Sequence, residues 1–80
     1  MPNPKIPSGI SSQKAQNALQ RLGFTFKRQK GSHIVMTRIH PDTDQIDTMI
    51  LIQGNEMAKG TLKTNLKKAN VEIEDFLENL

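Results

Sequence analysis

The chain has 80 residues, a formal net charge of +3 and no cysteine, which excludes disulfides and thiolate metal sites. A chain of this length buries roughly 60% of its unfolded surface, so we expect one domain over residues 1–80, with one core between two layers and no deep cofactor cleft. No segment approaches the roughly 20 apolar residues that a membrane span needs, so we expect a soluble cytoplasmic protein without membrane association.

Residues 1–9 contain three prolines and no apolar run, which predicts an irregular N-terminal arm rather than a signal peptide. Ser11 or Ser12 can then cap the N-terminus of a helix through its side-chain oxygen. Gly23 is suited to end that helix, because glycine readily adopts positive φ. The apolar positions between them repeat with the period of an amphipathic helix and are Ala15, Ala18, Leu19 and Leu22.

The first strand is expected over residues 24–29, where apolar and polar side chains alternate. The three phenylalanines of the chain, Phe24, Phe26 and Phe76, all fall at predicted core positions, and no tyrosine or tryptophan is present. Modules that read single-stranded RNA usually stack bases on exposed aromatic side chains. We therefore expect that any RNA binding depends on phosphate, sugar and shape contacts, with weak sequence preference.

A hairpin is expected next, with Lys30-Gly31 as its two-residue turn and glycine in the left-handed conformation. The second strand covers residues 32–38, with His33 on the face opposite the apolar Ile34 and Met36. A polar loop follows, and the aliphatic and β-branched residues 48–52 predict a third strand.

Two helices complete the chain. The first opens at Gly60-Thr61 and ends at Asn70, with apolar positions at Leu62, Leu66 and Ala69. The second has the apolar positions Ile73, Phe76, Leu77 and Leu80. The order αβββα with a short C-terminal helix predicts an α+β fold, in which helices cover one face of a three-stranded antiparallel sheet. The double-stranded-RNA-binding domain has this order, although a shared fold alone does not establish a function.

Positive charge is concentrated in the first half of the chain. Residues 1–38 contain seven Lys or Arg and no acidic residue, whereas all eight acidic residues lie from Asp42 onward. Such a block of charge attracts polyanions, and we favour nucleic-acid binding over the alternative of a merely solubilising surface.

His33 is the strongest candidate for proton transfer, because it follows the predicted turn and lies close in sequence to Lys27, Arg28 and Lys30. A histidine can take the proton of a ribose 2′-hydroxyl or protonate the departing 5′-oxygen. The three cations would hold the phosphate and stabilise the charge that develops on it. The alternative is a solvated strand histidine, and His40 in its polar loop is interpreted as incidental.

A second candidate phosphate site lies at the predicted start of the helix at Gly60. The segment Gly54–Thr61 resembles a P-loop, but its lysine and second glycine are transposed and a βαβ context is absent, which excludes a nucleotidase. Lys59, Gly60 and Thr61 could still hold a phosphate through free amides and charge, with an ordinary helix start as the alternative. No metal-ligand spacing and no cofactor motif are present, so we expect neither a metal nor a cofactor.

Four segments together resemble the HicA family, and they are Leu19–Phe24, Arg28–His33, Lys59–Leu62 and Phe76–Leu77. The resemblance implies a double-stranded-RNA-binding-domain-like fold. It also implies the toxin component of a type II toxin–antitoxin system, which cleaves mRNA as a metal-independent endoribonuclease (an mRNA interferase). The implied partners are mRNA and a cognate HicB-like antitoxin.

The resemblance assigns catalysis to His33 and the turn to Gly31. Many members of the family end the third strand with a proline and a second histidine, where this chain has Leu51 and Gln53. The residues expected to contact RNA are Lys27, Arg28, Lys30, Ser32 and Lys59. A non-catalytic RNA-binding module and a partner-docking protein of the same fold remain as alternative functions.

Overall fold

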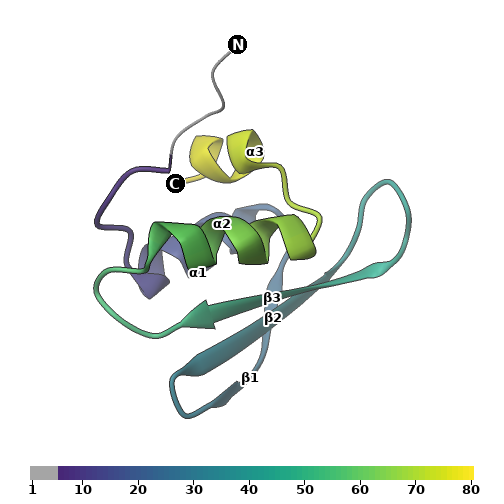
Figure 1. Ribbon diagram of the computed structural model, residues 1–80. Coiled ribbons are helices and arrows are strands. Elements are labelled where there is room, and N and C mark those ends of the chain that lie inside the picture. Colours follow the sequence, from purple (N-terminus) through teal and green to yellow (C-terminus); the bar gives the residue numbers. More distant parts are fainter. Residues whose placement is uncertain (1–5) are drawn as a thin grey trace.

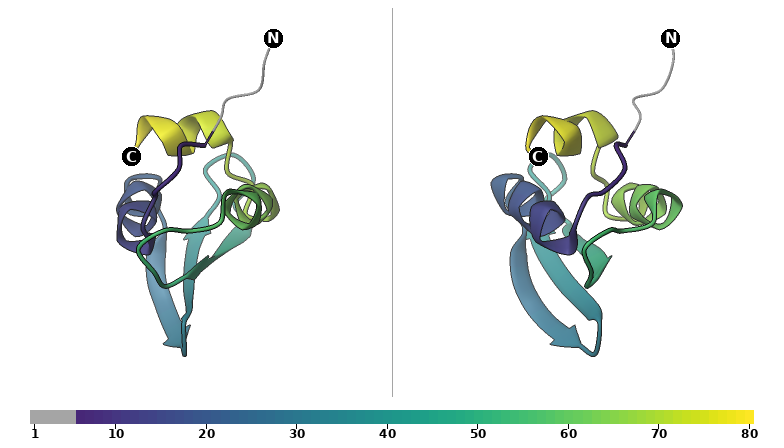
Figure 2. Two further views of the ribbon diagram at one scale, coloured as in Figure 1. Left: turned by 60° about the vertical axis from the view of Figure 1, so that its left-hand side comes forward. Right: turned by 90° about the vertical axis from the view of Figure 1, so that its left-hand side faces the viewer.

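The computed structural model describes residues 6–80 and contains three helices and three strands in these residues (Figure 1). In chain order they are α1 (Ser12–Arg21), β1 (Thr25–Lys30), β2 (His33–Ile39), β3 (Ile46–Ile52), α2 (Lys59–Lys68) and α3 (Ile73–Glu78). The strands form an antiparallel sheet in the order β1-β2-β3. Figure 2 shows the helices on one side of this sheet. The predicted α+β architecture is therefore confirmed.

The helix ends follow the predicted capping residues. Ser11 caps α1, with its Oγ accepting a hydrogen bond from the backbone amide of Lys14 at 3.1 Å. Gly23 follows that helix with φ of +97°, and Asn70 follows α2 with φ of +57°. These left-handed residues turn the chain away from each helix, which is the role that short or absent side chains permit.

The core lies between the helices and the covered face of the sheet, which contributes Ile34, Met36, Met49 and Leu51. Residues 1–5 of the predicted N-terminal arm lie outside the described residues, and Ile6 packs into the core with 8% of its surface exposed. Leu80 does not continue the apolar stripe of the last helix as expected, because α3 ends at Glu78 and the terminal residue is 44% exposed. None of the helices over residues 6–80 has the length and apolar character needed to cross a bilayer.

The hairpin turn lies one residue later than predicted. Lys30 is the last residue of β1 and pairs with His33, so the two turn residues are Gly31 and Ser32. Gly31, the first residue of this turn, has φ of +59°. Tight two-residue turns need positive φ at this position, which glycine adopts without steric cost. β3 begins at Ile46, two residues before the predicted start, because its first residues pair with the end of β2.

The strand β1 departs from the predicted alternation. Phe26 pairs with Met36 and Arg28 with Val35, so Lys27 is an extra residue in a β-bulge. The prediction that Phe26 belongs to the core is wrong, because its side chain is 55% exposed. The physical reason is that the helices α1 and α2 pack over β3, at the opposite edge of the sheet from β1.

A buried ion pair joins β2 and β3 at the end of the sheet away from the hairpin. Nε of Arg38 donates to Oδ2 of Asp47 at 2.9 Å. The other guanidinium nitrogens donate to the carbonyl oxygens of Leu22 and Asn70, each at 3.1 Å. The guanidinium also lies 4.7 Å from the ring centre of Phe24. One side chain therefore ties the end of α1, two strands and the end of α2 together.

Candidate functional site

His33 lies at the start of β2, directly after the hairpin turn. It pairs with Lys30 on β1 and with Ile52 on β3, and its side chain is exposed. The next residue, Ile34, points into the core, as does Met36 two positions further on. Since successive side chains of a strand point to opposite faces, His33 lies on the uncovered face of the sheet.

The bulge at Lys27 determines which face the neighbouring cations occupy. Strict alternation from Phe26 would place Arg28 and Lys30 on the covered face of the sheet. The extra residue shifts the register, so both cations pair with residues on the uncovered face, and directly paired residues point to the same side. The bulge therefore brings Arg28 and Lys30 to the side of the sheet that carries His33.

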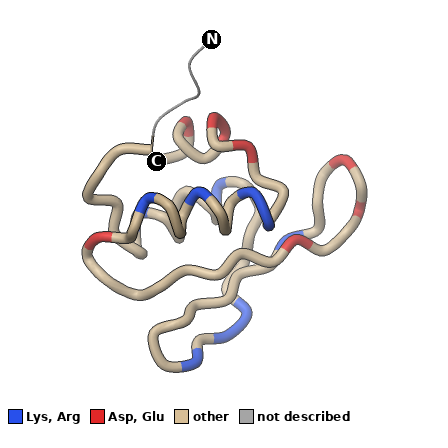
Figure 3. The backbone as a smooth tube through the Cα atoms, in the orientation of Figure 1, with Lys and Arg blue, Asp and Glu red and all other residues tan. Residues whose placement is uncertain are grey.

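The hairpin cations are available to an anionic ligand. Lys27, Arg28 and Lys30 are exposed, and the one ion pair found in residues 6–80 joins Arg38 to Asp47. Figure 3 shows the Lys and Arg positions of the hairpin together, away from the acidic positions. Because no carboxylate offsets their charge, they produce a local positive potential around the turn.

Two glutamine side chains fix the turn against the end of β3. Nε2 of Gln29 donates to the carbonyl oxygen of Gly31 at 3.0 Å and to Oε1 of Gln53 at 2.7 Å. The backbone amide of Gln53 donates to the carbonyl oxygen of Ser32 at 2.7 Å. Sequence reasoning treated Gln53 only as a departure from the family pattern and missed this contact, which joins residues 24 positions apart. These hydrogen bonds hold Gly31 and Ser32, which immediately precede His33.

Lys59, Gly60 and Thr61 form the first turn of α2. Ala58 precedes them and has no side-chain group to cap their free amides. Thr61 shares a hollow of about 140 Å³ with Gln53, and the acidic Glu56 also lines it. The lysines of α2 are nevertheless separate from the cations of the hairpin (Figure 3). The structure thus keeps the start of α2 separate from the basic group of the hairpin.

His40 lies at the other end of β2, and its Nδ1 accepts a hydrogen bond from the backbone amide of Asp42 at 3.1 Å. An open cleft of about 940 Å³ adjoins it, lined by both basic and acidic side chains. The seven-residue length of β2 separates the two histidines, so His40 does not contribute to the surface around His33.

A family model described as the HicA toxin of bacterial toxin–antitoxin systems matches residues 12–71. The match begins at the first residue of α1 and includes the hairpin with its bulge and the whole of α2. No curated relative matches the chain. The matched segment covers most of the sequence and contains every residue assigned to the candidate site. The chain therefore belongs to the HicA family of bacterial toxins.

Proposed function

We propose that this toxin is an endoribonuclease that cleaves mRNA, with His33 as its catalytic residue. The observation that carries the proposal is the register of β1 and β2, which aligns exposed His33 with Lys30 and puts Arg28 on the same face. A proton-transfer group beside unpaired cations is what cleavage of a phosphodiester by its own 2′-hydroxyl requires. Membership of a toxin family supports this assignment.

In the proposed reaction His33 acts as general acid or base. As a base it accepts the proton of the 2′-hydroxyl, whose oxygen attacks the adjacent phosphorus. The bond to the 5′-oxygen breaks, that oxygen takes up a proton from water, and the other fragment ends in a 2′,3′-cyclic phosphate. Arg28 and Lys30 stabilise the negative charge that grows on the phosphoryl oxygens, and Lys27 and Ser32 contact the RNA on either side.

The local structure fits these roles because it holds the turn in one arrangement. Gln29 on β1 and Gln53 at the end of β3 together anchor the Gly31-Ser32 turn, and pre-positioned groups need less reorganisation during the reaction. The free amides at Gly60 and Thr61, with Lys59 beside them, form a second phosphate-binding position at the start of α2. Thr61 at that position shares a hollow with Gln53, whose backbone amide donates to the carbonyl oxygen of Ser32 in the turn.

We also propose that cleavage needs no metal ion. Within residues 6–80, the His, Asp and Glu side chains form no group of three or more that could hold one. The toxin–antitoxin family implies an antitoxin partner, which we propose to be a HicB-like protein that covers the exposed hairpin. Neutralisation then follows from exclusion of mRNA from His33.

The test is incubation of the purified chain with an mRNA transcript in buffer that contains EDTA, with a mock preparation from cells lacking the chain as the control. We expect cleavage to proceed at the same rate with and without EDTA. Cleavage that EDTA abolishes would contradict the metal-free mechanism. Salt-sensitive binding without cleavage would instead identify a non-catalytic RNA-binding module.

A further inference from the structure

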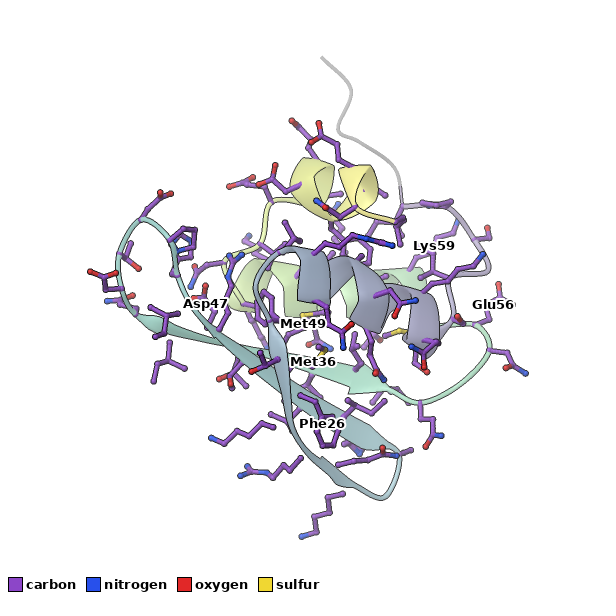
Figure 4. All side chains as sticks on the ribbon, turned by 180° about the vertical axis from the view of Figure 1, so that it is seen from behind. Phe26, Met36, Asp47, Met49, Glu56 and Lys59 are labelled. Carbon is purple, nitrogen blue, oxygen red and sulfur yellow. The ribbon has the colours of Figure 1, made fainter. Side chains whose placement is uncertain are left out.

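Of the three phenylalanines, only Phe26 is exposed. Its side chain is 55% exposed, whereas Phe24 and Phe76 are 1% and 0% exposed. Figure 4 shows its ring beyond Met36, at the end of the row of covered-face side chains that begins at Met49. An isolated exposed apolar side chain is common in proteins, so its meaning depends on what surrounds it.

Two cations directly follow Phe26 along β1. The next residue is the bulged Lys27, which has no partner on β2, and Arg28 follows on the uncovered face. An aromatic ring beside cations that have no acidic partner is the combination with which proteins bind single-stranded nucleic acids. The ring stacks on a base, and the cations contact the neighbouring phosphates.

We propose that Phe26 is a stacking platform for one base of single-stranded RNA, an inference that rests on the proposed function. Phe26 pairs with Met36, three positions along β2 from His33, which is about 10 Å along the strand. The stacked base is therefore not the base at the bond that His33 would cleave. The ring and the side chains of Arg28 and Lys30 lie on opposite faces of β1, so the RNA would cross the free edge of this strand.

The two apolar side chains that are more exposed than Phe26 lack this setting. Ile39 and Ile46 are 70% and 73% exposed and pair with each other at the far end of the sheet. The cation nearest to them in sequence, Arg38, is committed to the buried pair with Asp47. They have neither a ring for stacking nor a free cation, which makes Ile46 a suitable matched control.

The experiment measures binding of a short single-stranded 2′-deoxy oligonucleotide, which lacks the 2′-hydroxyl needed for cleavage. We expect Phe26→Ala to weaken binding roughly tenfold, within the range measured for base–aromatic stacking. Phe26→Leu, which keeps apolar bulk but has no ring, should weaken binding equally, whereas Phe26→Tyr and Ile46→Ala should bind like the wild type. Thermal unfolding of each variant verifies that it is folded.

A second set of oligonucleotides, each with one abasic position, identifies the stacked base. We expect one abasic position to weaken binding to the wild type about as much as Phe26→Ala does, and to have no further effect on that variant. If Phe26→Ala and Phe26→Leu bind like the wild type, the inference is overturned, while RNA cleavage by the wild type would leave the proposed function intact. If Phe26→Ala weakens only antitoxin binding, the ring belongs to a protein interface and the inference is also overturned.

Discussion

Replacing His33 with alanine is expected to lower the rate of RNA cleavage by about 100- to 10,000-fold, which is the usual contribution of a positioned general acid or base. The affinity for RNA should change little, because the cations of the hairpin remain in place. The fold should also tolerate the change, since this side chain is exposed and makes no hydrogen bond to the described residues. Single-turnover cleavage and binding to an uncleavable oligonucleotide measure the two effects separately.

His40→Ala is the matched control, because this histidine lies at the opposite end of β2 and near different charged groups. We expect it to cleave RNA like the wild type. A His33→Ala variant that retains full activity would refute the catalytic assignment. So would equal losses in the two variants, since a general effect of removing a histidine cannot identify a catalytic residue.

The second large effect is expected at Arg38, where substitution by alanine should lower the free energy of unfolding by about 3–5 kcal/mol. The variant leaves the carboxylate of Asp47 without its cation in a site where that residue is only 2% exposed. It also leaves the carbonyl oxygens of Leu22 and Asn70 without donors. Small domains unfold with about 5–15 kcal/mol, so we expect the variant to lose a large share of its free energy of unfolding, as measured by urea denaturation.

Arg21→Ala is the control for this substitution, because Arg21 is an exposed arginine that makes one hydrogen bond, at 2.7 Å to the carbonyl oxygen of Asn79. We expect it to lose less than about 1 kcal/mol, as for most surface substitutions. Equal stability of the Arg38→Ala and wild-type proteins would show that the buried ion pair does not hold the elements together.

The same pair makes stability depend on pH. Burial alone would raise the pKa of Asp47, but hydrogen bonds from Asn70 and Arg38, and the charges of His40 and Arg38, lower it below its usual value of 3.8. A carboxyl whose pKa is lower in the folded state contributes stability above its unfolded pKa and loses that contribution as the pH falls through the folded value. We therefore expect part of the unfolding free energy to disappear below about pH 4, and Asp47→Asn to lack this part.

The order and type of all six elements could be predicted because each depends on a local signal. The apolar repeat of α1 is bounded by Ser11 and Gly23, and both residues have the predicted capping roles. The strand pattern around Ile34 and Met36 likewise matches their burial. Such signals extend over a few residues and depend on side-chain type alone.

The errors occurred where structure depends on partners distant in sequence. Nothing near Phe26 shows that the helices leave β1 uncovered, so alternation alone placed its ring in the core. The bulge at Lys27 is a property of the pairing with β2, and the Gln29–Gln53 contact depends on the position of β3. The sequence motif could therefore nominate His33, but the pairing of the strands decides which cations lie beside it.

The central claim, that this chain cleaves RNA by attack of the neighbouring 2′-hydroxyl with help from His33, is tested most directly with two matched RNAs. One is unmodified, and the other carries 2′-O-methyl groups at the positions where the first is cut. We predict that the wild type cuts the unmodified RNA to give 2′,3′-cyclic phosphate ends and leaves the methylated bonds intact. Cleavage of the methylated bonds at the same rate would contradict the account, because no 2′-hydroxyl is then available to attack.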